Sequence, residues 1–293
     1  MATRVTRRQR TFLRPPDPSR PTEWLRAYLS SSWQARRRPR LDDLECFCFF
    51  VGYARSGHSL VGSVLNAHPE IVISHELDAL HFIERGFGRS QLFSLILRRD
   101  GDFGAMGRVW TGYEYTVPHQ FQGRFERLRV IGDKKGGRTA YELGERPELL
   151  DRVRRTVGLP IRVIHVTRNP FDNIVAQASR LRWSIPVTID WYERRCQAAA
   201  QSSMRLDPDE LCVVPYEAFA DDPRLWLSRL CSFVGVGVEE SYLRDCASIV
   251  QASTSRRRHS IRWEAGERRR VDDLIERHDF LRRYSFEEAD DRS

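Results

Sequence analysis

The residues with the clearest chemical potential form a short loop that follows the apolar segment 46–51. The spacing Gly52-x-x-x-x-Gly57-x-Ser59 is that of a phosphate-binding P-loop, in which backbone N–H groups and the start of a helix bind an anion. The lysine of that motif is replaced by His58, and a cation stands three residues earlier. The pattern predicts an anion site, with a surface turn of the same spacing as the alternative. The residues expected to contact the anion are Arg55, Ser56, Gly57, His58 and Ser59.

Further basic residues follow two other apolar segments. Lys134 and Lys135 are the only lysines among 48 basic residues, and an ammonium group is a compact charge on a flexible stem. Arg168 follows the next apolar segment, and Arg180 lies twelve residues later, about three turns along a predicted helix. Two arginines near an anion-binding loop indicate a second phosphate. The alternative is that an arginine here forms a salt bridge with Asp172.

Together, these motifs resemble the sulfotransferase family that uses 3′-phosphoadenosine 5′-phosphosulfate (PAPS). The family's first motif matches residues 55–59, which implies that this loop binds the 5′-phosphosulfate. Its second motif matches Arg168-Asn169-Pro170 and implies a 3′-phosphate site there. A third segment, from Tyr216-Glu217 through Asp222-Pro223 to Phe233-Val234-Gly235, also matches and implies that Tyr216 belongs to the donor site. The resemblance implies PAPS as the donor co-substrate and no metal.

The chain departs from the family pattern at two positions. His58 stands where the loop usually has threonine, and Ala176 stands where a serine usually contacts the 3′-phosphate. Gln177 or Ser179 is the candidate to replace that serine. The basic turn at Arg256–Arg258 lies about where relatives close a loop over the 3′-phosphate, with a solvated run of charge as the alternative.

The general base is also assigned from the resemblance. Tyrosylprotein-type and several bacterial relatives place a glutamate after an Asn-Ala-His-Pro turn, and Glu76 follows such a turn 21 residues after Arg55. His75 is the rival, because histidine suits proton transfer near neutral pH. A structural role for both residues is the third possibility. Lys134, together with Arg55, is expected to stabilise the charge on the leaving oxygen.

The predicted elements place these side chains together. Strands are predicted over residues 46–51, 128–131, 161–166 and 211–214, and helices over 58–67, 139–156, 170–182 and 222–234. Apolar strands that alternate with helices predict an α/β fold, a doubly wound parallel sheet flanked by helices. Ligands of such folds bind beyond the carboxyl ends of the strands. The residues that follow the four predicted strands are Arg55, Lys134, Arg168 and Tyr216.

The domain organisation is predicted to be a mobile basic arm over residues 1–20 and a single sulfotransferase domain over 21–293. Residues 100–127 mix glycine and aromatic residues without a period, which indicates an ordered insertion or lid, or a long loop pinned to the core. The longest apolar run is too short to span a membrane, and no secretory signal is visible. Six cysteines without a C-x-x-C pair favour a reducing compartment, so a cytoplasmic protein is expected.

The predicted function is transfer of a sulfuryl group from PAPS to a hydroxyl-bearing acceptor whose class the sequence leaves open. One alternative is a P-loop small-molecule kinase in which Asp133 binds Mg²⁺, although His58 in place of the P-loop lysine argues against it. A second alternative is a basic nucleic-acid-binding protein, given the net charge of +8, although no known nucleic-acid-binding module is recognisable. Neither a nucleic acid nor a membrane is expected as a partner.

Overall fold

The computed structural model describes residues 20–37, 41–250 and 256–287. Its centre is a parallel sheet of five strands in the order β2-β5-β1-β6-β7. The predicted α/β fold with a parallel sheet is confirmed. The predicted arm, apart from Arg20, lies outside the described residues. The strands are β1 Cys46–Gly52, β2 Ile71–His75, β5 Val130–Lys134, β6 Ile161–Thr167 and β7 Leu211–Pro215, and a small antiparallel pair consists of β3 Val109–Trp110 and β4 Tyr113–Glu114.

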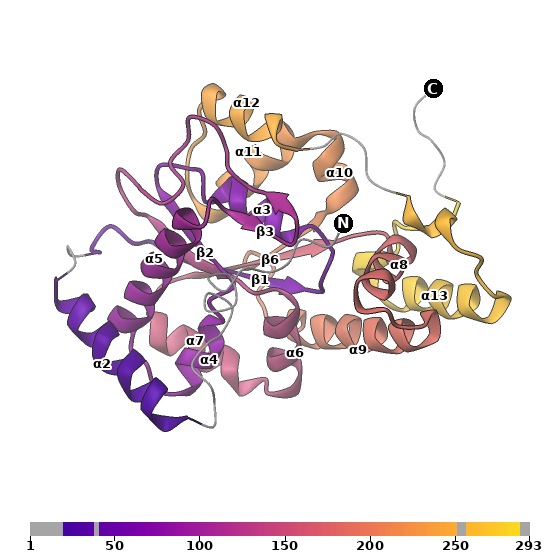
Figure 1. Cartoon of the computed structure of the whole chain (residues 1–293), viewed down its shortest axis with the longest axis horizontal. Coiled ribbons are helices and arrows are strands. Elements are labelled where there is room, and N and C mark those ends of the chain that lie inside the picture. The colour runs from indigo at the N-terminus through magenta and orange to yellow at the C-terminus, as the bar shows by residue number, and fades with distance from the viewer. Residues whose placement is uncertain (1–19, 38–40, 251–255, 288–293) are drawn as a thin grey trace.

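Both faces of this sheet are covered by helices, as alternate side chains of β1 show (Figure 1). Phe47 and Phe49 belong to one apolar cluster, whereas Cys48 and Phe50 belong to a second. A strand buried on both faces needs apolar residues at every position, which is what the sequence has. The first cluster contains residues of α2 Pro21–Arg37, α4 Ala79–Glu84, α5 Arg89–Ala105, α6 Gly137–Glu145 and α7 Glu148–Val157, and the second contains residues of α3 His58–Leu65, α10 Tyr216–Asp221, α11 Pro223–Val234 and α12 Glu240–Ser248.

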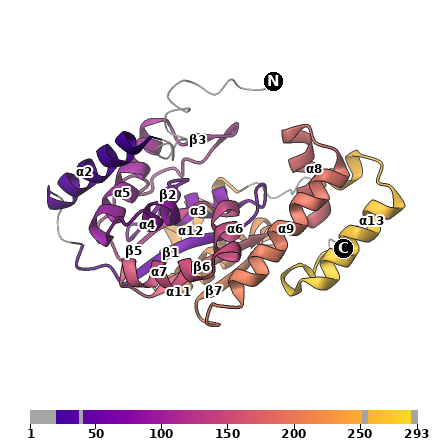
Figure 2. The ribbon, with the colours of Figure 1, turned by 90° about the horizontal axis from the view of Figure 1, so that it is seen from below.

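A third apolar cluster lies beside the sheet, between three helices that Figure 2 shows next to one another. Tyr53, directly after β1, packs in this cluster at 4.7 Å between its ring centroid and that of Tyr192. The contact joins the phosphate-loop strand to this helical group. The helices are α8 Pro170–Leu181, α9 Ile185–Ser203 and α13 Ala265–Arg277, with the short 3₁₀ turns η1 Arg257–Ser260 and η2 Asp279–Leu281 near them.

Several elements differ from the sequence expectation. Strand β2 and helix α9 were not predicted, and β5 begins at Val130 instead of residue 128. The helix predicted over 139–156 is two helices, because the chain breaks before Pro147, which has no N–H to continue the first one. The segment 100–127 contains the end of α5 and the β3–β4 hairpin, so it is an ordered insertion.

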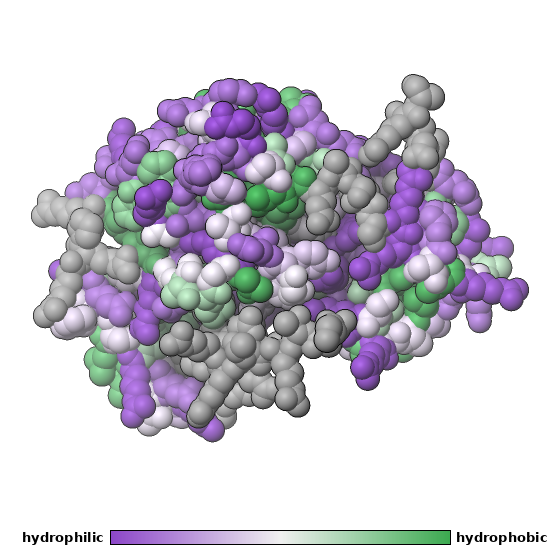
Figure 3. All heavy atoms as spheres, turned by 45° about the horizontal axis from the view of Figure 1, so that its top comes forward, coloured by the Kyte–Doolittle hydropathy of each residue, from purple (hydrophilic) through white to green (hydrophobic). Residues whose placement is uncertain are grey.

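The described surface is mainly hydrophilic on the face shown in Figure 3, where hydrophobic residues form small groups between charged and polar ones. Within the described residues, no helix is both long and apolar enough to cross a membrane.

Candidate active site

Four of the predicted site residues lie at the carboxyl edge of the parallel sheet, because each ends or follows one of its strands. Lys134 ends β5 and pairs in register with His75 at the end of β2. Arg55 follows β1, Arg168 follows β6, and Tyr216 follows β7. The sheet order β2-β5-β1-β6-β7 therefore places these strand ends side by side.

The phosphate loop is shaped by Gly57 and covered by Tyr216. Gly57 has φ 96°, and an added Cβ would lie 2.2 Å from Cδ2 of the Tyr216 ring. Only glycine fits at this position, for both conformational and steric reasons. Arg168 Nη1 donates to the Arg55 carbonyl at 3.2 Å, and its guanidinium lies 5.5 Å from the Tyr216 ring centroid. The structure thus brings together Arg55, Gly57, Arg168 and Tyr216.

His58 is turned into the loop. Its Nδ1 lies 3.1 Å from Ser56 Oγ, and both side chains are buried. Gly136, with φ 41°, lies against the ring so closely that an added Cβ would be 3.2 Å from it. Burial, with the nearby Lys134 cation, lowers the pKa of His58 to about 3. The imidazole is therefore neutral and braces the loop, and its predicted contact with an anion stays a prediction.

Glu76 lies between the two lysines of the chain. Lys134 Nζ donates to Glu76 Oε1 at 2.6 Å, and Lys135 Nζ donates to Oε2 at 2.8 Å. Lys134 also donates to Ser59 Oγ in the phosphate loop at 3.0 Å. Burial acts to raise the pKa of Glu76, but the two ammonium groups outweigh it and hold this pKa well below its ordinary value. Glu76 is a carboxylate at any physiological pH.

The turn that carries Glu76 is held by Asp133, one residue before Lys134. Glu76 has φ 59° and Asp78 has φ 72°, a backbone conformation that residues other than glycine rarely adopt. The buried Asp133 carboxylate accepts from the backbone N–H groups of residues 77, 78 and 79 at 2.9–3.0 Å, and from Ser74 Oγ at 2.8 Å. This carboxylate organises the turn, and four donors already use it. A Mg²⁺-binding role for Asp133, which the kinase alternative needs, is not favoured.

Arg99 fixes the same turn from helix α5. Its guanidinium donates to the carbonyl of His75 at 2.9 Å and to that of Glu76 at 2.8 Å. Burial lowers the pKa of Arg99 to about 10, which leaves it a cation at neutral pH. The strained backbone at Glu76 is therefore held by hydrogen bonds on both its N–H and C=O sides.

His75, the rival base, packs against the insertion. Its ring stacks on Phe103 with centroids 4.2 Å apart, and the Trp110 ring lies 4.9 Å away edge-on. Nε2 is 3.4 Å from Lys134 Nζ. Burial and this cation hold the pKa of His75 well below its ordinary value. The contacts also show what residues 100–127 do, since their aromatic side chains cover the end of β2 beside Lys134.

The predicted second phosphate site is less complete. Arg180 is exposed in the last turn of α8, about 15 Å along the helix from its start. Asp172 is bound by Arg258, whose backbone N and Nη1 each donate to it at 2.8 Å. Asp172 therefore forms a salt bridge with an arginine, as the alternative supposed, but the partner is Arg258. Ser179 Oγ donates to the Val175 carbonyl at 2.8 Å, so its hydroxyl is already engaged.

Two buried amides of α8 lie on either side of the Ala176 position. Neither Asn173 Nδ2 nor Asn173 Oδ1 has a hydrogen-bond partner among the described residues, and the same holds for Gln177 Oε1. Gln177 therefore remains the better of the two residues proposed to replace the missing serine. Residues 253–255, just before the basic turn, lie outside the described residues. Arg256 precedes η1, and Arg257 and Arg258 lie within it.

Comparison with known proteins bears on the family and the fold. A family model described as "Sulfotransferase family" matches residues 160–240, which include the Arg168 and Tyr216 motifs. Among solved structures, the sulfotransferase domain from the Synechococcus PCC 7002 olefin synthase is similar at a TM-score of 0.53 and 18% identity, covering 80% of this chain and 94% of that one. The fold is that of a sulfotransferase. The family resemblance predicted from the motifs is confirmed.

Two further solved structures share the sulfotransferase fold. The sulfotransferase domain from the curacin biosynthetic pathway has a TM-score of 0.53 and 16% identity, covering 83% of this chain and 99% of that one. Sulfotransferase STF9 from Mycobacterium avium has a TM-score of 0.51 and 9% identity, covering 87% of this chain and 81% of that one. No curated protein matches the sequence.

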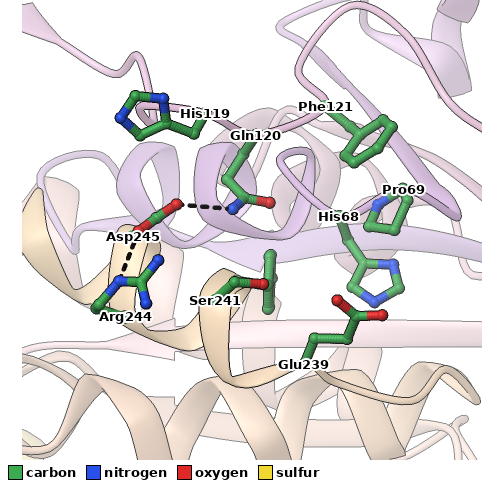
Figure 4. Close-up of a pocket in the computed structure, with 10 residues that line it drawn as sticks. His68, Pro69, His119, Gln120, Phe121, Glu239, Ser241, Arg244 and Asp245 are labelled. Carbon is green, nitrogen blue, oxygen red and sulfur yellow. Dashed lines mark hydrogen bonds and ion pairs between the residues drawn. The ribbon is translucent and has the colours of Figure 1, made fainter.

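A cavity of about 270 Å³ lies far from these residues, beside the amino end of β2 (Figure 4). His68 lines it, but both ring nitrogens are engaged, by Gly237 O at 2.8 Å and Glu70 N at 3.1 Å. In Figure 4, Gln120 points toward Asp245, to which its Nε2 donates at 3.0 Å. The cavity lies between α12, the insertion and the turn before β2, and none of the predicted site residues lines it.

Asp133 and Arg99 are the functional residues that sequence reasoning missed. Asp133 directly precedes Lys134 at the end of a buried strand. An aspartate in that place indicates a polar contact to a neighbouring turn, but from the sequence it was considered only as a metal ligand. Arg99 gave no signal, because its partners are backbone carbonyls 24 and 23 residues away. Among the described residues, no group of three or more histidine, cysteine, aspartate or glutamate side chains is placed to hold a metal ion.

Proposed function

We propose that this protein transfers a sulfuryl group from PAPS to a hydroxyl acceptor, with Glu76 as the general base. The observation that carries the proposal is the hydrogen bond from Lys134 to the Glu76 carboxylate, because the same ammonium also donates to Ser59 in the phosphate loop. Group transfer from an anionic donor needs a base, a cation and a loop that binds the anion. Here hydrogen bonds join a candidate for each of the three. The sulfotransferase fold and the family match support this reading.

The phosphate loop suits the donor on its own geometry. Arg55 Nε is buried and has no hydrogen-bond partner among the described residues. The first turn of α3 presents backbone N–H groups and the positive end of the helix dipole toward the loop. Arg55, Ser59 and this helix start would bind the 5′-phosphosulfate, with Ser56, Gly57 and His58 shaping the loop. Arg168, held over the loop by the Arg55 carbonyl, would bind the 3′-phosphate, with Tyr216 beside it and Arg180 as a more distant predicted ligand.

The bound donor supplies an activated sulfuryl group. Glu76 takes the proton of the acceptor hydroxyl as that oxygen forms a bond to sulfur. The bond between sulfur and the bridging oxygen breaks, and its electron pair stays on the adenosine 3′,5′-bisphosphate that leaves. Lys134 and Arg55 stabilise the charge that develops on this oxygen. By resemblance, the two cations take the role that Mg²⁺ has in phosphoryl transfer.

The test is transfer of labelled sulfate from PAPS to a panel of sugar, phenol, lipid and peptide hydroxyls. We expect labelled product from at least one class in the wild type and none above background in Glu76→Gln. A parallel incubation with labelled ATP and Mg²⁺ separates the kinase alternative. Label transfer from ATP, with none from PAPS on any acceptor class, would contradict the proposal.

A further inference from the structure

The two oxygens of the Glu76 carboxylate are bonded to different lysines. Oε1 accepts from Lys134 at 2.6 Å and Oε2 accepts from Lys135 at 2.8 Å. A carboxylate that accepts from two ammonium groups is a poor proton acceptor, because both contacts favour its charged form. With both contacts in place, the proposed base is masked.

Lys134 has a second position open to it. Its stem crosses α3 at Gly62, where an added Cβ would lie 3.0 Å from Lys134 Cγ, and its ammonium already contacts Ser59 in the phosphate loop. An anion bound in that loop would compete with Glu76 for this ammonium group. Gly62 has no side chain, so the helix leaves room for the stem where it passes.

Lys135 differs from its neighbour in burial and direction. Its side chain is 19% exposed, against 1% for Lys134, and it lies one residue beyond the end of β5. Lys135 donates to Glu76 Oε2, whereas Lys134 donates to Oε1. We propose that donor binding draws Lys134 away from Glu76, and that Lys135 then keeps the carboxylate ionised and aimed, with Oε1 released to take the acceptor proton. This inference rests on the proposed function, and it makes Lys135 a positioning residue.

The low pKa of Glu76 comes mainly from the two lysines, and the other ionisable groups around it contribute less. Burial keeps both neighbouring histidines neutral, and Arg99 binds backbone carbonyls. Asp133 is used by the turn, while Asp78, whose pKa burial raises to about 7, lies 3.1 Å from Arg138. The groups concerned are His58, His75, Asp78, Asp133, Arg99 and Arg138.

The pH profile of kcat at saturating donor tests the role of Lys135. The profile reports the base in the complex, and turnover falls on the acid side as Glu76 is protonated. Removal of Lys135 raises the Glu76 pKa, so in Lys135→Gln the acid limb should move to higher pH by about one unit or more. Lys135→Arg should keep the limb in place, as should Arg138→Gln, which removes a nearby cation that pairs with Asp78 and Glu142 instead.

A merely structural role for Lys135 would lower kcat equally at every pH without moving the limb. That result in Lys135→Gln would overturn the inference. Lys135→Met serves as a second neutral variant if the glutamine variant does not fold, and it should show the same shift.

The release of Glu76 can be observed without turnover. In protein with ¹³C-labelled glutamate, the Glu76 carboxyl resonance is assigned by its loss in Glu76→Gln and titrated with and without adenosine 3′,5′-bisphosphate. We expect its protonation midpoint to rise when the ligand is bound, and to rise in ligand-free Lys134→Met as well. Ligand binding shown by a higher Tm, with an unmoved midpoint, would overturn the release but leave the proposed function intact. No Tm shift with this ligand would overturn both.

Discussion

The two predicted phosphate sites of this protein differ in how completely the fold assembles them. At the first, the loop, the base and the cation are joined by hydrogen bonds from Ser59 through Lys134 to Glu76. At the second, Arg168 lies over the loop, while Arg180 is exposed at the far end of α8 and Asp172 is bound by Arg258. The first site is built from adjacent strand ends, whose positions the sheet fixes. The second depends on a helix and a distant turn, whose positions other packing contacts decide.

The largest effect is expected at the base of the first site. Glu76→Gln keeps the shape and removes the proton acceptor, so turnover should fall by about 10²–10⁴-fold. The fall is measured by single-turnover kinetics at saturating donor. The assay temperature stays well below the Tm of the variant, because the substitution leaves two ammonium groups without their shared carboxylate and should destabilise the fold. His75→Gln is the control and should retain most activity. Full activity in Glu76→Gln with its loss in His75→Gln would transfer the role to His75.

The next effect separates transition-state stabilisation from binding at the same site. If Lys134 stabilises the charge that develops on the leaving oxygen more strongly than it stabilises the bound donor, Lys134→Met should lower kcat by about 10²–10³-fold and weaken donor binding much less. Donor affinity is measured by calorimetry with adenosine 3′,5′-bisphosphate, and kcat in the transfer assay. A loss confined to binding would make Lys134 an ordinary phosphate ligand, and the contrast between the two sites would weaken.

A smaller effect tests the second site. Charge-assisted contacts are worth about 1.5–3 kcal/mol, so Arg168→Ala should weaken binding of adenosine 3′,5′-bisphosphate about tenfold or more. Arg180→Ala should weaken it much less, given its exposure. The wild type should bind adenosine 5′-phosphate far more weakly than the bisphosphate. Equal losses in both variants would show that α8 and its last turn reach the ligand, and the second site would be as complete as the first.

The smallest effect is a pH dependence of stability at the first site. The pKa of Glu76 is lower in the folded protein than in the unfolded chain, so its contribution is present above the unfolded pKa of about 4.3 and is lost as pH falls below it. The free energy of unfolding of the wild type should fall relative to Glu76→Gln by up to about 1.4 kcal/mol per pH unit in that acid range. Urea unfolding from pH 6 to pH 3 measures it. Parallel curves for the two proteins would show that the lysines do not stabilise the carboxylate.

Much of the fold followed from local pattern. The strands at 46–52, 161–167 and 211–215 are continuous apolar runs, and such runs predict a sheet buried on both faces. Strand β2 escaped prediction because it is five residues long and ends in Ser74 and His75, whose polar side chains break the apolar run. Its existence depends on pairing with β5, which local sequence does not reveal.

The apolar runs and the residues that follow them were enough to predict that the loop after β1, Lys134 and Arg168 meet at one edge of a parallel sheet. Each follows an apolar strand, and strand ends of a parallel sheet share an edge. The position of Glu76 between Lys134 and Lys135 could not be predicted from local pattern. These contacts span 58 and 59 positions of sequence, and the pairing of β2 with β5 brings the residues together. The same holds for the hydrogen bonds of Asp133 and Arg99, which hold the Glu76 turn in a conformation the local sequence does not favour.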